Sequence, residues 1–168
     1  MIIMCAQKLW RVVRRQVLRS NPVPAPCGLL GPWAATRFQE EDDDVVIAIE
    51  ESTYLTVVLP LSARALRVAF REAVAAALED LRVPALRVEL ELSAMEHMSF
   101  EPLRDTTLQG VLRDLEMYCG IELSYHSDLR IVQRNLNDVP HPSLPEHVPG
   151  AAVARLLGRF RPQPARPH

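Results

Sequence analysis

Residues 33–59, WAATRFQEEDDDVVIAIEESTYLTVVL, decide the fold, because three segments of this stretch have the composition of β-strands. Two of them, residues 33–38 and 45–49, lie on either side of the acidic run 40–44. A charged run between two such segments is typical of a turn in solvent. Residues 53–59 are rich in β-branched types and supply the third segment. The stretch therefore predicts three strands of one sheet.

A helix and a further strand are expected after these three strands. Pro60 and Ser62 form a helix start, and the helix is expected to continue through Leu81. Its apolar residues recur at helical spacing and define one buried stripe, which comprises Leu66, Phe70, Val74, Ala77, Leu78 and Leu81. Across residues 86–92 every second residue is apolar, which predicts a strand with one buried and one solvent-facing side.

Before residue 33, a short strand at 2–4 is expected to lead into an amphipathic helix at 6–19. The polar side of this helix is basic and carries Lys8, Arg11, Arg14, Arg15 and Arg19. The first 39 residues contain no acid, which is also a property of organellar import signals, but the apolar start and the scarcity of serine favour a strand and a helix. Prolines and glycines across 22–31 predict a loop.

The C-terminal half predicts one short strand and three helices. They are, in chain order, a strand at 98–100, a helix from Thr106 or Thr107 to Gly120, a short helix from Ser127 or Asp128 to Leu136, and a helix at 151–160. Residues 161–168 hold three prolines without periodicity and predict a disordered tail.

Together these elements predict a single α+β domain over residues 1–160. We expect a mixed or antiparallel sheet, helices mainly on one face of it and a helical C-terminal segment. The length of 168 residues suits one hydrophobic core. No apolar run approaches the roughly 20 residues that cross a bilayer. The three cysteines are widely spaced and form no C-x-x-C pair, so we expect a reducing compartment and a cytoplasmic protein.

Motifs for catalysis and for cofactors are absent from the sequence. The six glycines form no phosphate-binding loop, and no G-x-S-x-G nucleophile motif occurs. The net charge of −2 removes a strong overall attraction to nucleic acid, although a local basic patch remains open. We therefore expect no cofactor and favour a protein without catalytic activity.

Metal binding is a second hypothesis that the sequence disfavours. The acidic run 40–44 lacks the spaced ligands and the glycine of calcium loops, so it reads as a hairpin tip in solvent. His126, His141 and His147 could join Glu146 around a metal ion, but none of the histidines has a second histidine at i+4. The surrounding prolines indicate a surface loop, and we expect no metal site.

Four stretches carry a likeness to known sequences: MIIMCAQKL at 1–9, GPWA at 31–34, TLQGVLRD at 107–114 and RNLNDVP at 134–140. They resemble a bacterial family of small proteins that is catalogued only as a domain of unknown function. The third stretch keeps Thr107, Gly110, Leu112 and Asp114 of an R-S-V-L-G-S-x-N-D-like run but replaces its arginine and asparagine. The resemblance implies the architecture and a bacterial origin, and it supplies no reaction, cofactor or catalytic residue.

One polar cluster surrounds the predicted helix start near residue 106. It comprises Arg104, Asp105, Thr106, Thr107, Arg113 and Asp114. Free backbone amides at a helix start could hold an anion, and ordinary capping explains threonine and aspartate there as well. Arg104, Thr107 and Asp114 are therefore the candidate ligand-binding residues.

Three functional hypotheses remain open from the sequence. The first is a non-catalytic binding or regulatory module with a protein partner, because a complete fold pattern occurs without a catalytic motif. The second is a small enzyme or toxin-like nuclease that uses Arg104 and Asp114. The third is nucleic-acid binding through the basic helix at 6–19, although a solvated helix face explains its charge equally simply.

Overall fold

The computed structural model describes residues 1–17, 28–40, 43–61 and 66–158. Most of the predicted loop at 22–31, the predicted helix start at Ser62 and the predicted tail at 161–168 lie outside these ranges. Among the described helices, none combines the length and the apolar character needed to cross a membrane.

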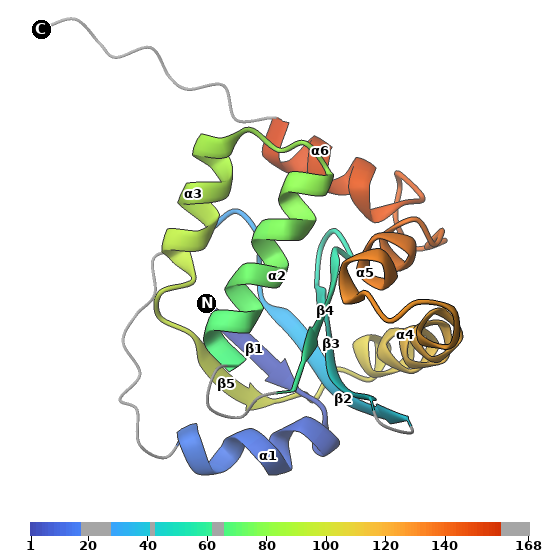
Figure 1. Ribbon diagram of the computed structural model, residues 1–168. Coiled ribbons are helices and arrows are strands. Elements are labelled where there is room, and N and C mark those ends of the chain that lie inside the picture. Colours follow the sequence, from blue (N-terminus) through green and yellow to red (C-terminus); the bar gives the residue numbers. More distant parts are fainter. Residues whose placement is uncertain (18–27, 41–42, 62–65, 159–168) are drawn as a thin grey trace, which may run out of the picture.

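The described strands form one mixed sheet of five strands, which confirms the predicted α+β class (Figure 1). They are β1 (Ile2–Cys5), β2 (Trp33–Glu40), β3 (Asp43–Glu50), β4 (Thr56–Pro60) and β5 (Ser99–Pro102). Their order across the sheet is β4-β3-β2-β1-β5. β1 pairs in parallel with β2 and β5, whereas β3 is antiparallel to β2 and β4. A helix connects β1 to β2 because parallel neighbours cannot be joined by a tight turn.

Helices cover both faces of this sheet, so the expectation of helices mainly on one face was wrong. They are α1 (Gln7–Val17), α2 (Leu66–Asp80), α3 (Ala85–Ala94), α4 (Thr106–Tyr125), α5 (Leu129–Asn137) and α6 (Pro149–Gly158). Figure 1 shows α2 and α3 on one side of the sheet and α4 and α5 on the other. The first side is filled by side chains of α1, α2 and α3, and the second by side chains of α4 and α5.

Strand β3 gives the physical reason for the two covered faces. All five residues from Val45 to Ile49 are buried, and their side chains point alternately into the two cores. An unbroken apolar strand of this kind must be covered on both sides. On the first side, Trp33 packs edge-to-face against Phe70 at a ring distance of 5.1 Å.

The prediction of a strand at 86–92 is wrong, because these residues form helix α3. Leu86 and Leu90 are exposed in the helix, whereas Val88, Glu91 and Ala94 face the interior. The carboxylate of Glu91 accepts hydrogen bonds from the backbone N–H of Leu29 at 2.8 Å and of Leu30 at 3.1 Å. Leucine, arginine and glutamate are all good helix formers, so helical propensity and this buried carboxylate outweigh the alternating pattern.

The remaining predicted elements are present with shifted ends. Helix α4 continues past Gly120 to Tyr125, and its N-terminus is capped by Asp105 instead of a threonine. The third strand begins at Thr56 and not at residue 53, because the chain turns sharply through Tyr54, which has a φ of 56°. The strand near 98–100, the short helix α5 and the last helix α6 occur where the sequence places them.

Candidate functional site

The three candidate ligand-binding residues lie at the start of α4 and along it. Arg104, Thr107 and Asp114 are all exposed. Asp105 accepts a hydrogen bond from the backbone N–H of Leu108 at 2.9 Å, so a side chain already satisfies one amide of the helix start. This arrangement is ordinary capping. Anion binding by Arg104, Thr107 and Asp114 stays a prediction.

The basic face of α1 is exposed where the structure describes it. Lys8, Arg11 and Arg14 point into solvent, whereas the Arg15 side chain and the whole of Arg19 lie outside the described residues. Lys8 pairs with Glu116 of α4, with 3.2 Å between Nζ and Oε2. Helix α1 contains no acidic residue, and the exposed Arg11 and Arg14 make its outer side basic.

The histidines considered as metal ligands have other contacts. His126 lies 3.9 Å from a carboxylate oxygen of Glu122, and Glu146 forms an ion pair with Arg155. His147 has a left-handed backbone with a φ of 64°. Within the described part of the chain, no group of three or more histidine, cysteine, aspartate or glutamate side chains is arranged to hold a metal ion.

His141 is half-buried in the segment that connects α5 to α6. Its ring packs edge-to-face against Tyr54 at a centroid distance of 5.2 Å. Burial lowers the pKa of His141 below its usual value, and the nearby negative charge of Asp114 acts in the opposite direction. Its Nε2 atom is buried and has no hydrogen-bond partner among the described residues. Burial therefore favours the neutral form of the imidazole.

The buried polar side chains serve the backbone. Glu50 is fully buried and accepts hydrogen bonds from the N–H groups of Gly31 at 2.8 Å and Thr53 at 2.7 Å. Glu91 holds the segment before β2, as described above. Gln133 and Asn137 bind backbone groups of the edge strand β4. These carboxylates and amides have structural roles, and they leave no buried side-chain pair poised for proton transfer among them.

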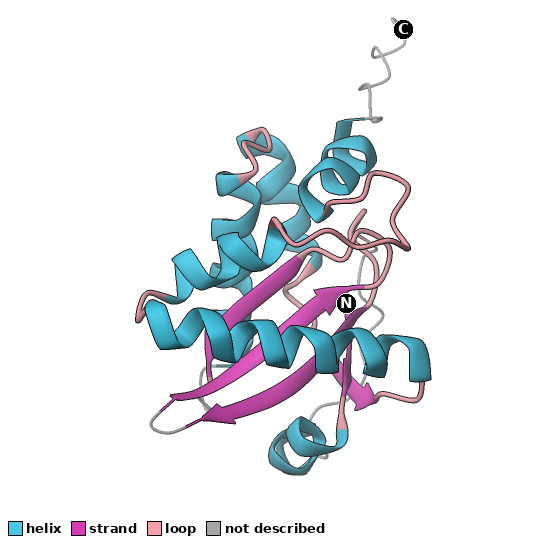
Figure 2. Cartoon of the chain, turned by 90° about the vertical axis from the view of Figure 1, so that its right-hand side faces the viewer, coloured by secondary structure: helices cyan, strands magenta, loops and turns pink. Residues whose placement is uncertain are grey.

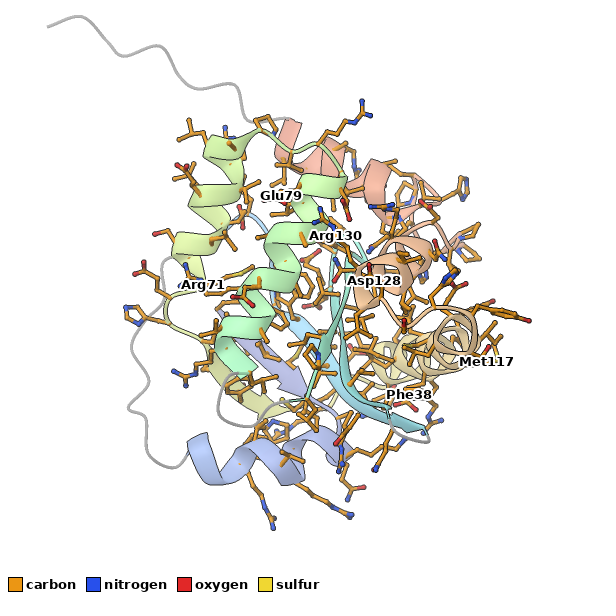
Figure 3. All side chains as sticks on the ribbon, viewed as in Figure 1. Phe38, Arg71, Glu79, Met117, Asp128 and Arg130 are labelled. Carbon is orange, nitrogen blue, oxygen red and sulfur yellow. The ribbon has the colours of Figure 1, made fainter. Side chains whose placement is uncertain are left out.

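The outer face of α4 is the feature that the sequence reasoning missed. We use this name for four exposed apolar side chains at helical spacing, Met117, Tyr118, Ile121 and Tyr125. Met117, Ile121 and Tyr125 keep 57%, 50% and 78% of their surface exposed. In Figure 2 the long helix α4 lies across the front of the sheet, and Figure 3 shows Met117 at the outer margin of the molecule.

Helix α5 adds one more apolar side chain beside this face. Asn135 of α5 donates a hydrogen bond to Glu122 of α4 with 2.6 Å between Nδ2 and Oε2, which places the two helices side by side. Ile131 lies one turn before Asn135, so it projects along the same side of α5, where it is exposed. Clustered apolar side chains on a surface mark interaction sites more often than isolated ones do.

A sequence signal for this face exists. Helix α4 buries Leu108, Leu112, Leu115 and Cys119 on its inner side. The residues four apart from Met117 to Tyr125 form a second apolar stripe, and a helix with two apolar stripes has more apolar surface than one core can cover. The inner stripe alone is sufficient to predict the helix, so the prediction assigned no function to the outer stripe.

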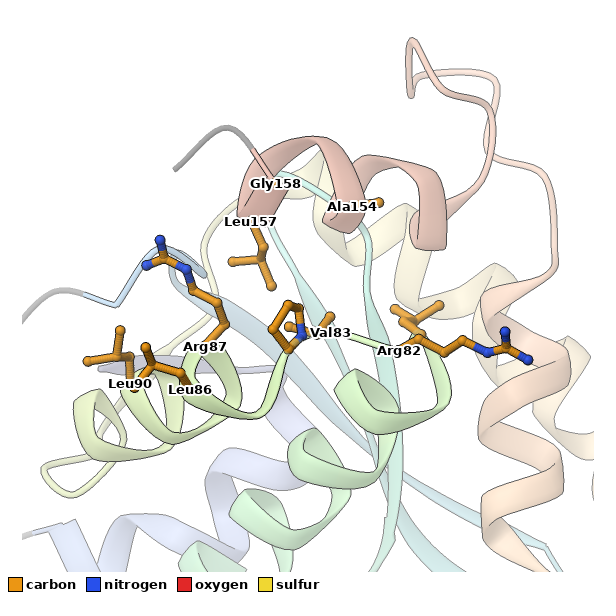
Figure 4. Close-up of a pocket in the computed structure, with 10 residues that line it drawn as sticks. Arg82, Val83, Leu86, Arg87, Leu90, Ala154, Leu157 and Gly158 are labelled. Atoms are coloured by element: carbon orange, nitrogen blue, oxygen red, sulfur yellow. The ribbon is translucent and has the colours of Figure 1, made fainter. Parts of the chain in front are cut away.

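An apolar groove of about 520 Å³ is a second candidate feature (Figure 4). It lies between the α2–α3 turn, α3 and α6 and is lined by Leu81, Arg82, Val83, Pro84, Leu86, Arg87, Leu90, Ala154, Leu157 and Gly158. Its volume is within the range of small-molecule sites. In Figure 4, the side chain of Arg82 points away from the apolar side chains that line the groove, so it offers them no convergent polar partner.

Comparison with known protein families gives a match. The model of a family described as a domain of unknown function, DUF6933, matches residues 2–148. No curated protein matches the chain. The matched residues include the sheet and helices α1 to α5, and therefore the complete outer face of α4. Helix α6, which forms one wall of the groove, follows the matched region.

Proposed function

The chain belongs to the DUF6933 family, a domain of unknown function, and from that premise we propose that it is a non-catalytic binding module that docks a protein through the outer face of α4. The observation that carries this proposal is the exposed apolar cluster of Met117, Tyr118, Ile121 and Tyr125. Covering such side chains removes apolar surface from water, which is the main favourable term in protein association.

Two further observations support a binding role over a catalytic one. The buried carboxylates Glu50 and Glu91 are engaged by backbone N–H groups. The polar residues considered for an enzyme, Arg104 and Asp114, are exposed and lie outside the apolar groove. Catalytic groups in enzymes usually lie in a concave pocket. Neither residue has that environment.

The test compares the proteins that are captured in cells by three tagged forms of the full chain: the wild type and two single variants. Ile121→Lys places a charge at the centre of the outer face of α4, where half of the Ile121 side chain is exposed. Val68→Lys on α2 is the matched control, because Val68 is 58% exposed and lies on another helix. A partner that is retained by Val68→Lys and lost by Ile121→Lys is expected. Capture that is equal for all three versions contradicts the proposal.

A second candidate is binding of a nucleic-acid backbone through α1. It is favoured by the exposed Arg11 and Arg14 on a helix that has no acidic residue. Such binding depends steeply on salt because bound counterions are released from the phosphates. Fluorescence anisotropy with a labelled oligonucleotide at low and high salt tests it. Absence of binding at about 50 mM salt, or affinity that does not change with salt, removes this candidate.

A further inference from the structure

We propose that the protein that covers the outer face of α4 is a second copy of this chain, packed with the two α4 helices antiparallel about a two-fold axis. This inference deepens the proposed function and rests on it. A symmetric interface requires that one surface be complementary to itself, so each feature on one half must find its counterpart on the other half. The residues on α4 meet this requirement.

The first argument is access. Helix α4 has 20 residues and is therefore about 30 Å long, which is enough to form a continuous contact. Figure 1 shows α4 near end-on at the margin of the molecule, and Figure 2 shows its full length in front of the other described elements. A second copy can therefore approach α4 without first meeting another described part of the fold.

The second argument is the position of two polar groups relative to the apolar centre. Asp114 and Tyr125 are eleven residues apart, which is close to three helical turns, so both lie on the same side of α4 about 16 Å apart. A two-fold axis midway between them places Tyr125 opposite the partner's Asp114, and Asp114 opposite the partner's Tyr125. The same axis places Met117 opposite the partner's Ile121. Apolar groups thus meet apolar groups in the centre.

The third argument is charge. Tyr125 is an exposed phenol that can donate a hydrogen bond, and Asp114 is an exposed carboxylate that accepts one. Hydrogen bonds to a charged acceptor are stronger than those between neutral groups. The two-fold axis keeps the two Asp114 carboxylates at opposite ends of the face, about 16 Å apart along the helix axes, where salt screens their repulsion. Two copies of the face therefore attract through two equivalent hydrogen bonds and do not repel each other.

The size of the face predicts a weak dimer. Four apolar side chains of α4 with Ile131 of α5 make a small interface, at the lower end of the range for specific complexes. We expect a dissociation constant in the micromolar range. Sedimentation velocity of the full chain between about 1 and 500 µM, which covers this affinity range, measures it directly.

Ile121→Lys should raise the dissociation constant by at least about tenfold, because it buries an unpaired charge at the centre of the interface. Val68→Lys should leave the dissociation constant unchanged. Circular dichroism of both variants shows that each is folded. A chain that stays monomeric at every concentration overturns the inference, as does a dimer that Ile121→Lys leaves intact.

The antiparallel register has its own test. Tyr125→Glu should weaken the dimer, because it places a carboxylate opposite the partner's Asp114. Adding Asp114→Lys to that variant should restore the dimer, since the ammonium group introduced on each copy then lies opposite the carboxylate introduced on the other copy. A double variant that is as weak as Tyr125→Glu alone contradicts the antiparallel register.

The outcome for the dimer is distinguishable from the outcome for the proposed function. If the wild-type chain is monomeric and Ile121→Lys still removes a specific captured protein, the partner is a different protein and only the dimer is overturned. If the chain is monomeric and Ile121→Lys changes no captured protein, the binding role of the outer face of α4 is overturned as well.

Discussion

The side-chain amide of Asn137 pairs with both backbone groups of Thr56. The N–H of Thr56 donates to Oδ1 at 2.8 Å, and Nδ2 donates to the carbonyl oxygen of Thr56 at 2.7 Å. One turn earlier in α5, Gln133 accepts a hydrogen bond from the N–H of Val58 at 3.1 Å. Helix α5 therefore occupies the free edge of β4, which would otherwise be available for pairing with another strand.

Replacing Asn137 should destabilise the protein, because its side chain pairs with the edge strand β4. Asn137→Leu leaves the buried N–H and carbonyl groups of Thr56 without partners, and we expect a loss of about 2–4 kcal/mol in the free energy of unfolding. Asn135→Ala is the control on the same helix: it removes one hydrogen bond to the partly exposed carboxylate of Glu122, which water can replace, so it should cost only about 1–2 kcal/mol. Urea denaturation measures both. An equal decrease in the free energy of unfolding for both variants would show that the contact with the edge of β4 contributes no more than an ordinary hydrogen bond.

Two glycines should respond to alanine in opposite directions. A Cβ atom at Gly28 would lie 2.5 Å from Oε2 of Glu91, so Gly28→Ala should disturb the buried carboxylate and destabilise the fold by about 1–3 kcal/mol. A Cβ atom at Gly110 meets nothing within 4 Å, so Gly110→Ala should stabilise α4 by up to about 1 kcal/mol. Thermal denaturation of the two variants checks the signs. A stabilising Gly28→Ala would contradict the close approach.

His141 should make stability depend on pH below neutrality. Because its pKa is lowered in the folded protein, the unfolded chain binds more protons as the pH falls below about 6.5, and the free energy of unfolding decreases. His141→Gln should reduce this decrease between about pH 7.5 and 5.5. An unchanged pH dependence in His141→Gln would assign the effect to other groups.

The thiol of Cys5 should be unreactive in the folded protein. Burial raises the pKa of Cys5 to about 12, so almost no thiolate forms near neutral pH. A Cys27→Ser variant removes the cysteine that lies outside the described residues, and the remaining Cys5 and Cys119 are both buried. We expect a thiol reagent to modify this variant only after denaturant is added. Rapid modification of the native protein would show that β1 or α4 opens readily.

The sequence predicted most elements correctly because their periodicity is local. The apolar run of β3, the single stripe of α2 and the inner stripe of α4 each report one buried surface, and all three elements form as expected. The candidate site was harder to predict from the sequence. Arg104, Thr107 and Asp114 were selected for their polarity, but the exposed cluster around Ile121 is apolar and therefore resembled core in the sequence.

The sequence by itself determined the α+β class, the strands between residues 33 and 60 and the inner stripes of the helices, because spacing along the chain specifies which sides of an element are apolar. The tertiary structure decided that residues 86–92 are helical, that both faces of the sheet are covered and that Asn137 closes the edge of β4. These outcomes depend on contacts between residues far apart in the chain. A buried carboxylate or amide stabilises a fold only when distant backbone groups reach it, and local periodicity carries no information on that distance.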